Sequence, residues 1–224
     1  AVTEENWHHL WLSEGFATYL GDQYFEAADG VETFRRLMEE SRQGVINSTD
    51  VERPIYDPAE TSLFALLNAN NYPNGGWVLH MLRGVVGDNA FFAGIREYYR
   101  RNAHSVADTE DFQTVMEGVA GDDLDWFFSQ WIYRPGFPTF DLEWRWIPGD
   151  GSTGAVEVTV RQTQRESWPT FRVPTEIAIE GPGGETRHDV ELLTREQVIR
   201  IDGLANRPTE VVLDPDGWVL KGDG

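Results

Sequence analysis

Cysteine is absent from the 224 residues, so disulfide bonds and thiolate metal ligands are excluded. Lysine is almost absent as well, because Lys221 is the only one. No apolar run is long enough to span a bilayer, and no segment has the pattern of a signal peptide. The chain lacks an initial Met and opens at Ala1 within patterned sequence, which we interpret as a fragment of a longer protein. Its compartment stays open, with export favoured over the cytoplasm.

Positive charge is scarce throughout the chain. Lys and Arg number 18 against 38 Asp and Glu, which gives a formal net charge of -20. Binding to phosphate groups needs basic patches, so this balance argues against nucleic acid and against an anionic membrane surface as partners. It favours solubility and, among ligands, cations. A phosphate-binding loop is not expected either, because the glycine-rich run 181–184 lies between predicted strands rather than before a helix.

Apolar spacing divides the chain in two. Up to about Arg134 it is helical, and after Pro138 apolar and polar residues alternate. The predicted helices cover residues 10–28, 31–43, 77–87, 89–101, 109–120 and 124–133, and residues 44–62 are predicted as loop. The predicted strands lie near residues 140–146, 156–160, 177–179, 190–192, 198–201 and 211–213. We therefore expect α and β structure in separate segments, helical over residues 1–135 and an antiparallel β-sandwich over residues 137–224.

Glu14 is an unusual carboxylate, because it lies within an apolar and helical run. At helical spacing it shares one stripe with Trp7, Leu10, Trp11, Ala17 and Thr18. Such a stripe faces a core, where an ionised carboxylate needs a partner. The spacing alone leaves three partners open for Glu14: a buried Arg, a helix N-terminus or a metal ion.

The segment 10–19, which reads LWLSEGFATY, resembles part of the aminopeptidase N family of zinc metallopeptidases, the gluzincins. In that family a helix bearing His-Glu-x-x-His is followed, about 18 residues later, by a Glu in the context Asn-Glu-Gly-Phe-Ala. That Glu is the third zinc ligand, so the resemblance implies the same role for Glu14. Ser13 stands where Asn is usual. Zinc binds imidazole nitrogen and carboxylate oxygen, and catalytic sites combine three protein ligands with water.

Two further segments carry the same resemblance. Residues 71–82, NYPNGGWVLHML, are similar to a segment in which a Tyr hydroxyl donates a hydrogen bond to the oxyanion of the reaction intermediate. The resemblance assigns that place to Tyr72, while Asn74 stands where Lys is usual. Residues 123–131, DLDWFFSQW, resemble the end of the family's catalytic domain before its β-sandwich, and we expect their aromatic side chains in the core.

The paired histidines of the family are missing from this chain. Its histidines are at positions 8, 9, 80, 104 and 188, and no His-x-x-x-His occurs. The resemblance places both zinc-binding histidines and the general-base Glu before Ala1, so we expect Zn²⁺ in the longer parent and little or no peptidase activity from the isolated chain. Glu5 and His9 could share a helical face, but two ligands make a weak site and a solvated helix start is the simpler interpretation. His80 lies on a predicted core-facing helix and is expected to be a satisfied core or semi-exposed histidine.

The resemblance implies that the parent is a zinc-dependent aminopeptidase with peptides as substrates. Two alternatives stay open: a non-catalytic scaffold of the same fold, and a carbohydrate- or protein-binding sandwich with a helical appendage. If the histidine-bearing helix belongs to another part of the parent, the side chains that would pack on it should be exposed. Trp7, Leu10, Trp11 and Tyr72 are the candidates, and they predict possible self-association of the chain.

Overall fold

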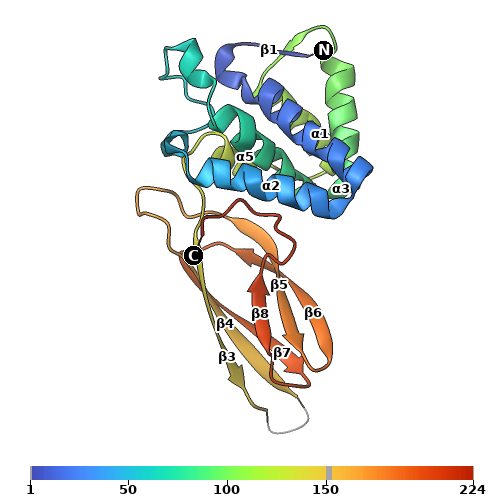
Figure 1. The fold of residues 1–224 in the computed structure, drawn as a ribbon, viewed down its shortest axis with the longest axis vertical. Coiled ribbons are helices and arrows are strands. Elements are labelled where there is room, and N and C mark those ends of the chain that lie inside the picture. The colour runs from blue at the N-terminus through green and yellow to red at the C-terminus, as the bar shows by residue number, and fades with distance from the viewer. Residues whose placement is uncertain (1, 150–152, 224) are drawn as a thin grey trace. The chain divides into compact units, whose positions relative to one another are not determined.

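The structure is a computed structural model that describes residues 2–149 and 153–223. The chain forms two compact units, Ala1–Gly136 and Phe137–Gly224 (Figure 1). The first is helical and the second consists of antiparallel strands, as the change in apolar spacing predicts. None of the described helices is long and apolar enough to cross a membrane.

The helical unit contains five α-helices. They are α1 (Trp11–Asp29), α2 (Val31–Ile46), α3 (Gly75–Asn102), α4 (Thr109–Ala120) and α5 (Asp125–Trp131). A two-residue parallel ladder joins β1 (Thr3–Glu4) to β2 (Val106–Ala107). Short 3₁₀ turns at Trp7–His9, Thr49–Glu52 and Leu63–Leu66 and a π-helical turn at Asn70–Asn74 fill the connections.

Local sequence signals set several helix ends. Gly87 has a φ of 79°, which breaks α3 where the sequence predicts a stop. Asp108 is the N-cap of α4, and its side chain accepts a hydrogen bond from the Asp111 N–H. The Asp111 side chain accepts from the Asp108 N–H in return, so the two carboxylates form a capping box.

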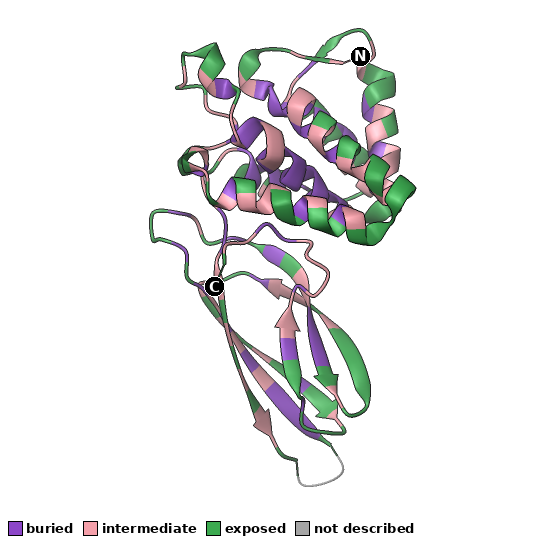
Figure 2. Cartoon of the chain, viewed as in Figure 1, coloured by how far each residue is buried: buried purple, intermediate pink, exposed green. Residues whose placement is uncertain are grey.

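The core of the helical unit is aromatic. Phe112 is fully buried and its ring contacts those of Trp11, Phe16, Tyr98 and Phe128. Figure 2 shows the buried residues on the inward sides of the helices. Edge-to-face packing of this kind adds to the free energy gained by burying the rings.

The predicted stripe around Glu14 is partly wrong. The buried face of α1 consists of Trp11, Leu12, Gly15 and Tyr19. Trp7 precedes the helix in a 3₁₀ turn and is 45% exposed, and Ala17 is exposed. The face turned inward is the one that packs on α3 and α2, which shifts the stripe around the helix and leaves Glu14 half-buried at its margin.

The second unit contains two three-stranded sheets. One has the order β3 (Phe140–Ile147), β4 (Gly154–Gln162), β7 (Glu196–Leu204), and the other β6 (Gly184–Leu192), β5 (Val173–Gly181), β8 (Glu210–Leu213). Every pair is antiparallel. On the central strand β4, Val156, Val158 and Val160 are buried and alternate with less buried residues, which confirms the period of two.

Candidate functional site

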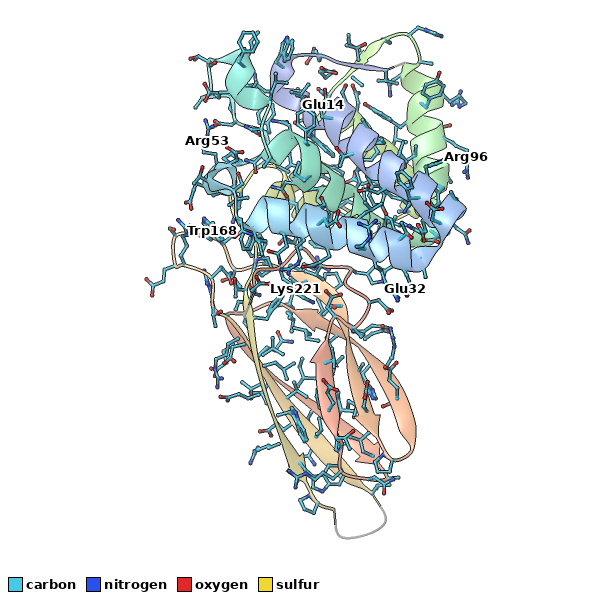
Figure 3. The ribbon with its side chains drawn as sticks, viewed as in Figure 1. Glu14, Glu32, Arg53, Arg96, Trp168 and Lys221 are labelled. Carbon is cyan, nitrogen blue, oxygen red and sulfur yellow. The ribbon has the colours of Figure 1, made fainter. Side chains whose placement is uncertain are left out.

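Glu14 lies in the first turn of α1, where a carboxylate is favoured by the helix dipole. Figure 3 labels it on that helix. Two local hydrogen bonds order its surroundings. The Ser13 hydroxyl donates to the Glu4 carboxylate, and Thr18 Oγ1 donates to the Glu14 carbonyl at 2.8 Å. The Glu14 side chain itself stays half-buried.

Tyr72 comes to Glu14 from a different part of the chain. It lies in the π-helical turn Asn70–Asn74, which leads directly into α3. The turn packs against α1, and the Tyr72 side chain lies close enough to Glu14 for that carboxylate to act on its hydroxyl. Partial loss of hydration, and then the negative charge of Glu14, raise the pKa of Tyr72 above its ordinary value of 10. The structure thus brings together the two site residues that the resemblance singles out.

Side-chain amides hold the turn that carries Tyr72. Asn70 Nδ2 donates to the carbonyls of Asp50 at 2.7 Å and Arg53 at 3.0 Å. Asn74 Nδ2 donates to Asn70 Oδ1 at 3.1 Å. Both asparagines are buried, so these bonds are shielded from competing water. Asn74, which stands where the family has Lys, therefore serves to lock the turn.

Sequence reasoning missed these positioning residues. The signal that could have found them is the density of asparagine, at positions 68, 70, 71 and 74, around a single proline. Asparagine side chains bond readily to nearby backbone and stabilise irregular turns. Short π-helical turns also occur frequently at functional sites.

A polar network connects α1 and α3 further along the same pair of helices. The Tyr19 hydroxyl bonds to His80 Nδ1 at 3.2 Å, and both side chains are buried. Arg83 Nη1 lies 3.1 Å from Glu26, and its Nε and Nη2 contact both oxygens of Asp88 at 2.7 and 3.1 Å. His80 is thus a satisfied core histidine, as the sequence predicts. Arg83, the buried arginine of this unit, is paired with Glu26 and Asp88 and not with Glu14.

His9 has a structural partner of its own. Its Nδ1 accepts the Thr109 N–H at 3.2 Å and lies 2.9 Å from the Thr109 hydroxyl, which also accepts the Trp11 indole N–H at 3.0 Å. Burial lowers the pKa of His9 below 6.5, although Asp108, Glu110 and Glu5 act in the opposite direction. A neutral His9 therefore caps the start of α4, while Glu5 is exposed.

The expectation that Leu10 and Trp11 are exposed is wrong. Leu10 is 3% and Trp11 0% exposed, because Trp11 packs on Phe112 and donates to Thr109. Trp7 is exposed as expected, and Tyr72 is half-buried. Self-association of the chain stays a prediction. The exposed apolar surface that supports it is smaller than expected, because it lacks Leu10 and Trp11.

The described residues do not supply a complete zinc donor set. In residues 2–149 and 153–223, the group of three potential ligands whose atoms lie within 4.8 Å of one another is Glu117, Asp123 and Asp125. It does not include Glu14. Glu117 already accepts from Gln113 and from the Leu124 N–H, so this cluster has the features of a hydrogen-bonded helix start. Glu14 would contribute one carboxylate to a site that needs two more protein ligands.

Comparison with known proteins places the chain in a family. The profile of the peptidase family M1 domain matches residues 1–131, and the chain belongs to that family. Aminopeptidase N of Streptomyces lividans is 30% identical over 239 residues, which cover 96% of this chain and 27% of that protein. Aminopeptidase M1 of Arabidopsis thaliana is 28% identical over 144 residues, which cover 61% of this chain and 16% of that protein.

A solved structure has the same fold. Aminopeptidase A of Legionella pneumophila, crystallised in complex with aspartic acid, superposes on 100% of this chain with a TM-score of 0.78 at 18% identity. The chain corresponds to 25% of that protein, so it spans only about a sixth to a quarter of the length of these relatives. The expected combination of helical segment and β-sandwich is confirmed.

Proposed function

We propose that this chain is the part of a zinc aminopeptidase of family M1 that supplies one metal ligand and one oxyanion donor. Glu14 is the ligand and Tyr72 is the donor. The observation that carries this proposal is the packing of the Tyr72 turn against α1, which brings the two side chains together from separate parts of the chain so that the Glu14 charge acts on the Tyr72 hydroxyl. The relatives are aminopeptidases, so the substrate class is the N-terminal end of peptides.

The chemistry of these residues suits the proposed roles. A zinc ion, when bound, polarises the scissile carbonyl and activates water. Glu14 is a half-buried carboxylate, and carboxylate oxygen is a ligand that zinc accepts. Tyr72 is protonated at neutral pH, because the ordinary tyrosine pKa of 10 already lies well above it and the pKa here is raised further, and it therefore has a proton to donate to developing negative charge.

The turn around Tyr72 supports precise placement of its hydroxyl. The buried bonds from Asn70 and Asn74 fix the backbone on both sides of the tyrosine. A donor held in place before the reaction lowers the barrier more than one that must reorganise. The remaining zinc ligands and the general base would come from the parts of the longer protein that this chain does not span.

The test uses the whole protein that contains this chain. Tyr72→Phe should lower kcat by about 10²–10³ and change KM much less, because the lost bond matters mainly in the transition state. Glu14→Gln should reduce bound zinc below one equivalent. Tyr24→Phe is a matched control, because Tyr24 is 68% exposed on α1, and it should leave both quantities unchanged.

The isolated 224-residue chain provides the second arm of the test. We expect little or no turnover of an aminoacyl-amide substrate and less than stoichiometric zinc. Robust turnover that a chelator abolishes would overturn the expectation of inactivity. A whole protein that binds no zinc and cleaves no peptide would instead favour the scaffold alternative.

A further inference from the structure

Helices α1 and α3 touch through their backbones at two glycines. A Cβ atom built on Gly15 would lie 2.8 Å from the Gly75 carbonyl carbon and 3.0 Å from its Cα. A Cβ built on Gly75 would lie 3.1 Å from the Gly15 Cα and 3.3 Å from the Trp11 Cβ. Backbone atoms cannot turn aside as a flexible side chain does. Any residue larger than glycine at position 15 therefore forces the two helices apart.

This contact lies next to the candidate site in both helices. Gly15 follows Glu14 directly, and Gly75 begins α3 just after the turn that holds Tyr72. The distance between the two backbones at this point therefore sets how far the Tyr72 hydroxyl lies from the Glu14 carboxylate.

Other glycines of the same helices do not have this property. Gly21 on α1 has nothing within 4 Å of a built Cβ, and on α3 a Cβ at Gly76 would first meet the Thr18 Cγ2 at 3.4 Å, an ordinary contact. Glycine in a helix interior is unfavourable relative to Ala. A functional or packing reason is therefore needed at position 15.

We infer that Gly15 and Gly75 are positioning residues, and that their backbone contact holds the Tyr72 side chain beside the Glu14 carboxylate. The catalytic meaning of this inference rests on the proposed function, whereas the positional claim concerns only the two side chains. Displacements of about 1 Å are enough to disrupt such a site. Intrinsic helix propensity acts in the opposite direction, since Ala at position 15 favours the helix, and so cannot account for a loss of the contact.

The first test is a double-mutant cycle on the 224-residue chain, measured by denaturant unfolding. Tyr72→Phe and Glu14→Gln are made singly and together, once in the natural background and once with Gly15→Ala. We expect the two substitutions to be coupled in the natural background and additive in the Gly15→Ala background. Retention of the full coupling with Ala at position 15 would overturn the inference.

Matched variants separate positioning from general damage. Gly75→Ala makes the milder clash and should reduce the coupling without abolishing it, which keeps the test decisive if Gly15→Ala does not fold. Gly21→Ala and Gly76→Ala should leave the coupling intact, and loss of the coupling in either of them would contradict the inference.

The second test is kinetic and uses the whole protein. Tyr72→Phe should lower kcat strongly in the natural background but add little to Gly15→Ala, with KM much less affected in both cases. If the whole protein has no peptidase activity, the proposed function fails while the unfolding cycle still decides the positional claim. If activity is present but the effects of Tyr72→Phe and Gly15→Ala on kcat simply multiply, the proposed function survives and the positional inference is overturned.

Discussion

Among the described residues, the helical unit buries more polar side chains than the sandwich, whose buried ones are Gln162, Gln164 and Asp214. In the helical unit Asn70, Asn74, His9, His80 and Arg83 are each at most 8% exposed and hydrogen-bonded. The sandwich places its largest ionic networks at the surface. Arg161 contacts Asp141, Glu143 and Glu196, and Arg187 contacts Glu176, Glu185 and Asp216.

The difference shows which unit is built to fix a geometry. A buried polar group must keep its hydrogen-bond partners, because water cannot replace a lost partner there and the unsatisfied group destabilises the fold. It therefore tolerates a single arrangement of the surrounding helices. Exposed ion pairs are screened and exchange freely with water, so they constrain the strands much less. Glu14 and Tyr72 lie in the helical unit, where buried and hydrogen-bonded polar side chains hold the backbone in place.

Arginine replacement should show the largest contrast between the units. Arg83→Ala removes the cation between Glu26 and Asp88, and its side chain is only 9% exposed. We expect the helical unit to lose about 2 kcal/mol of stability, because the buried guanidinium is lost together with its hydrogen bonds to two carboxylates. Arg187→Ala, at 36% exposure, should cost the sandwich at most about 1 kcal/mol.

Hydrogen–deuterium exchange, resolved separately for the two units, measures both losses in one protein. The Arg83 effect should persist in high salt, whereas the Arg187 effect should shrink as the charges are screened. Equal losses from the two arginines would remove the contrast between the units.

Asp214 is a buried carboxylate of the sandwich and tests the effect of burial within that unit. Its carboxylate is buried and accepts from the Trp218 N–H at 2.8 Å, the Val219 N–H at 3.2 Å and Lys221 Nζ at 2.6 Å. Asp214→Asn keeps the shape but sets an amide N–H against one of these donors. We expect a loss of about 2 kcal/mol. The φ of 55° at this position suits Asn as well as Asp, so the backbone adds nothing to the loss.

The control for Asp214 is Asp216→Asn two residues away in the same turn. Asp216 lies in the surface network of Arg187, and its loss should cost at most about 1 kcal/mol. Thermal unfolding of the two variants, followed by hydrogen exchange in the sandwich, distinguishes them. If Asp214→Asn is as stable as Asp216→Asn, burial does not determine how much a polar side chain contributes to the stability of the sandwich.

The elements with a strong local pattern are the ones that the sequence predicts well. Alternation of Val156, Val158 and Val160 locates the central strand, and Gly87 locates the break in α3. The inward face of α1 depends instead on where α3 packs, which is a tertiary effect. Spacing alone therefore predicted the wrong stripe, in which Trp7 and Trp11 share one core-facing side.

The candidate site shows the same division. The pattern within α1 marks Glu14 as unusual, but nothing local links it to Tyr72, and only the resemblance to a family joins the two. The π-helical turn has no simple periodicity, so the buried bonds of Asn70 and Asn74 were not predicted. Neither was the contact of Gly15 with Gly75, since a glycine alone does not reveal which backbone approaches it.

The smallest effect is expected from titration of His9, and it tests whether burial alone controls a polar group of the helical unit. Burial lowers the pKa of His9 in the folded protein below the ordinary 6.5, despite the nearby Asp108, Glu110 and Glu5. Between the folded pKa and 6.5 the unfolded chain binds more protons. Stability is therefore complete above pH 6.5 and falls as the pH drops through this window.

The measurement is the free energy of unfolding from pH 8 to pH 5, where one titrating group contributes at most about 1.4 kcal/mol per pH unit. His9→Gln should flatten the curve, because Gln offers an acceptor to the Thr109 N–H without gaining a proton. His104→Asn is the control, since His104 is exposed and Asn tolerates its φ of 64°. A natural protein whose stability rises on acidification through this range would mean that the three carboxylates outweigh burial.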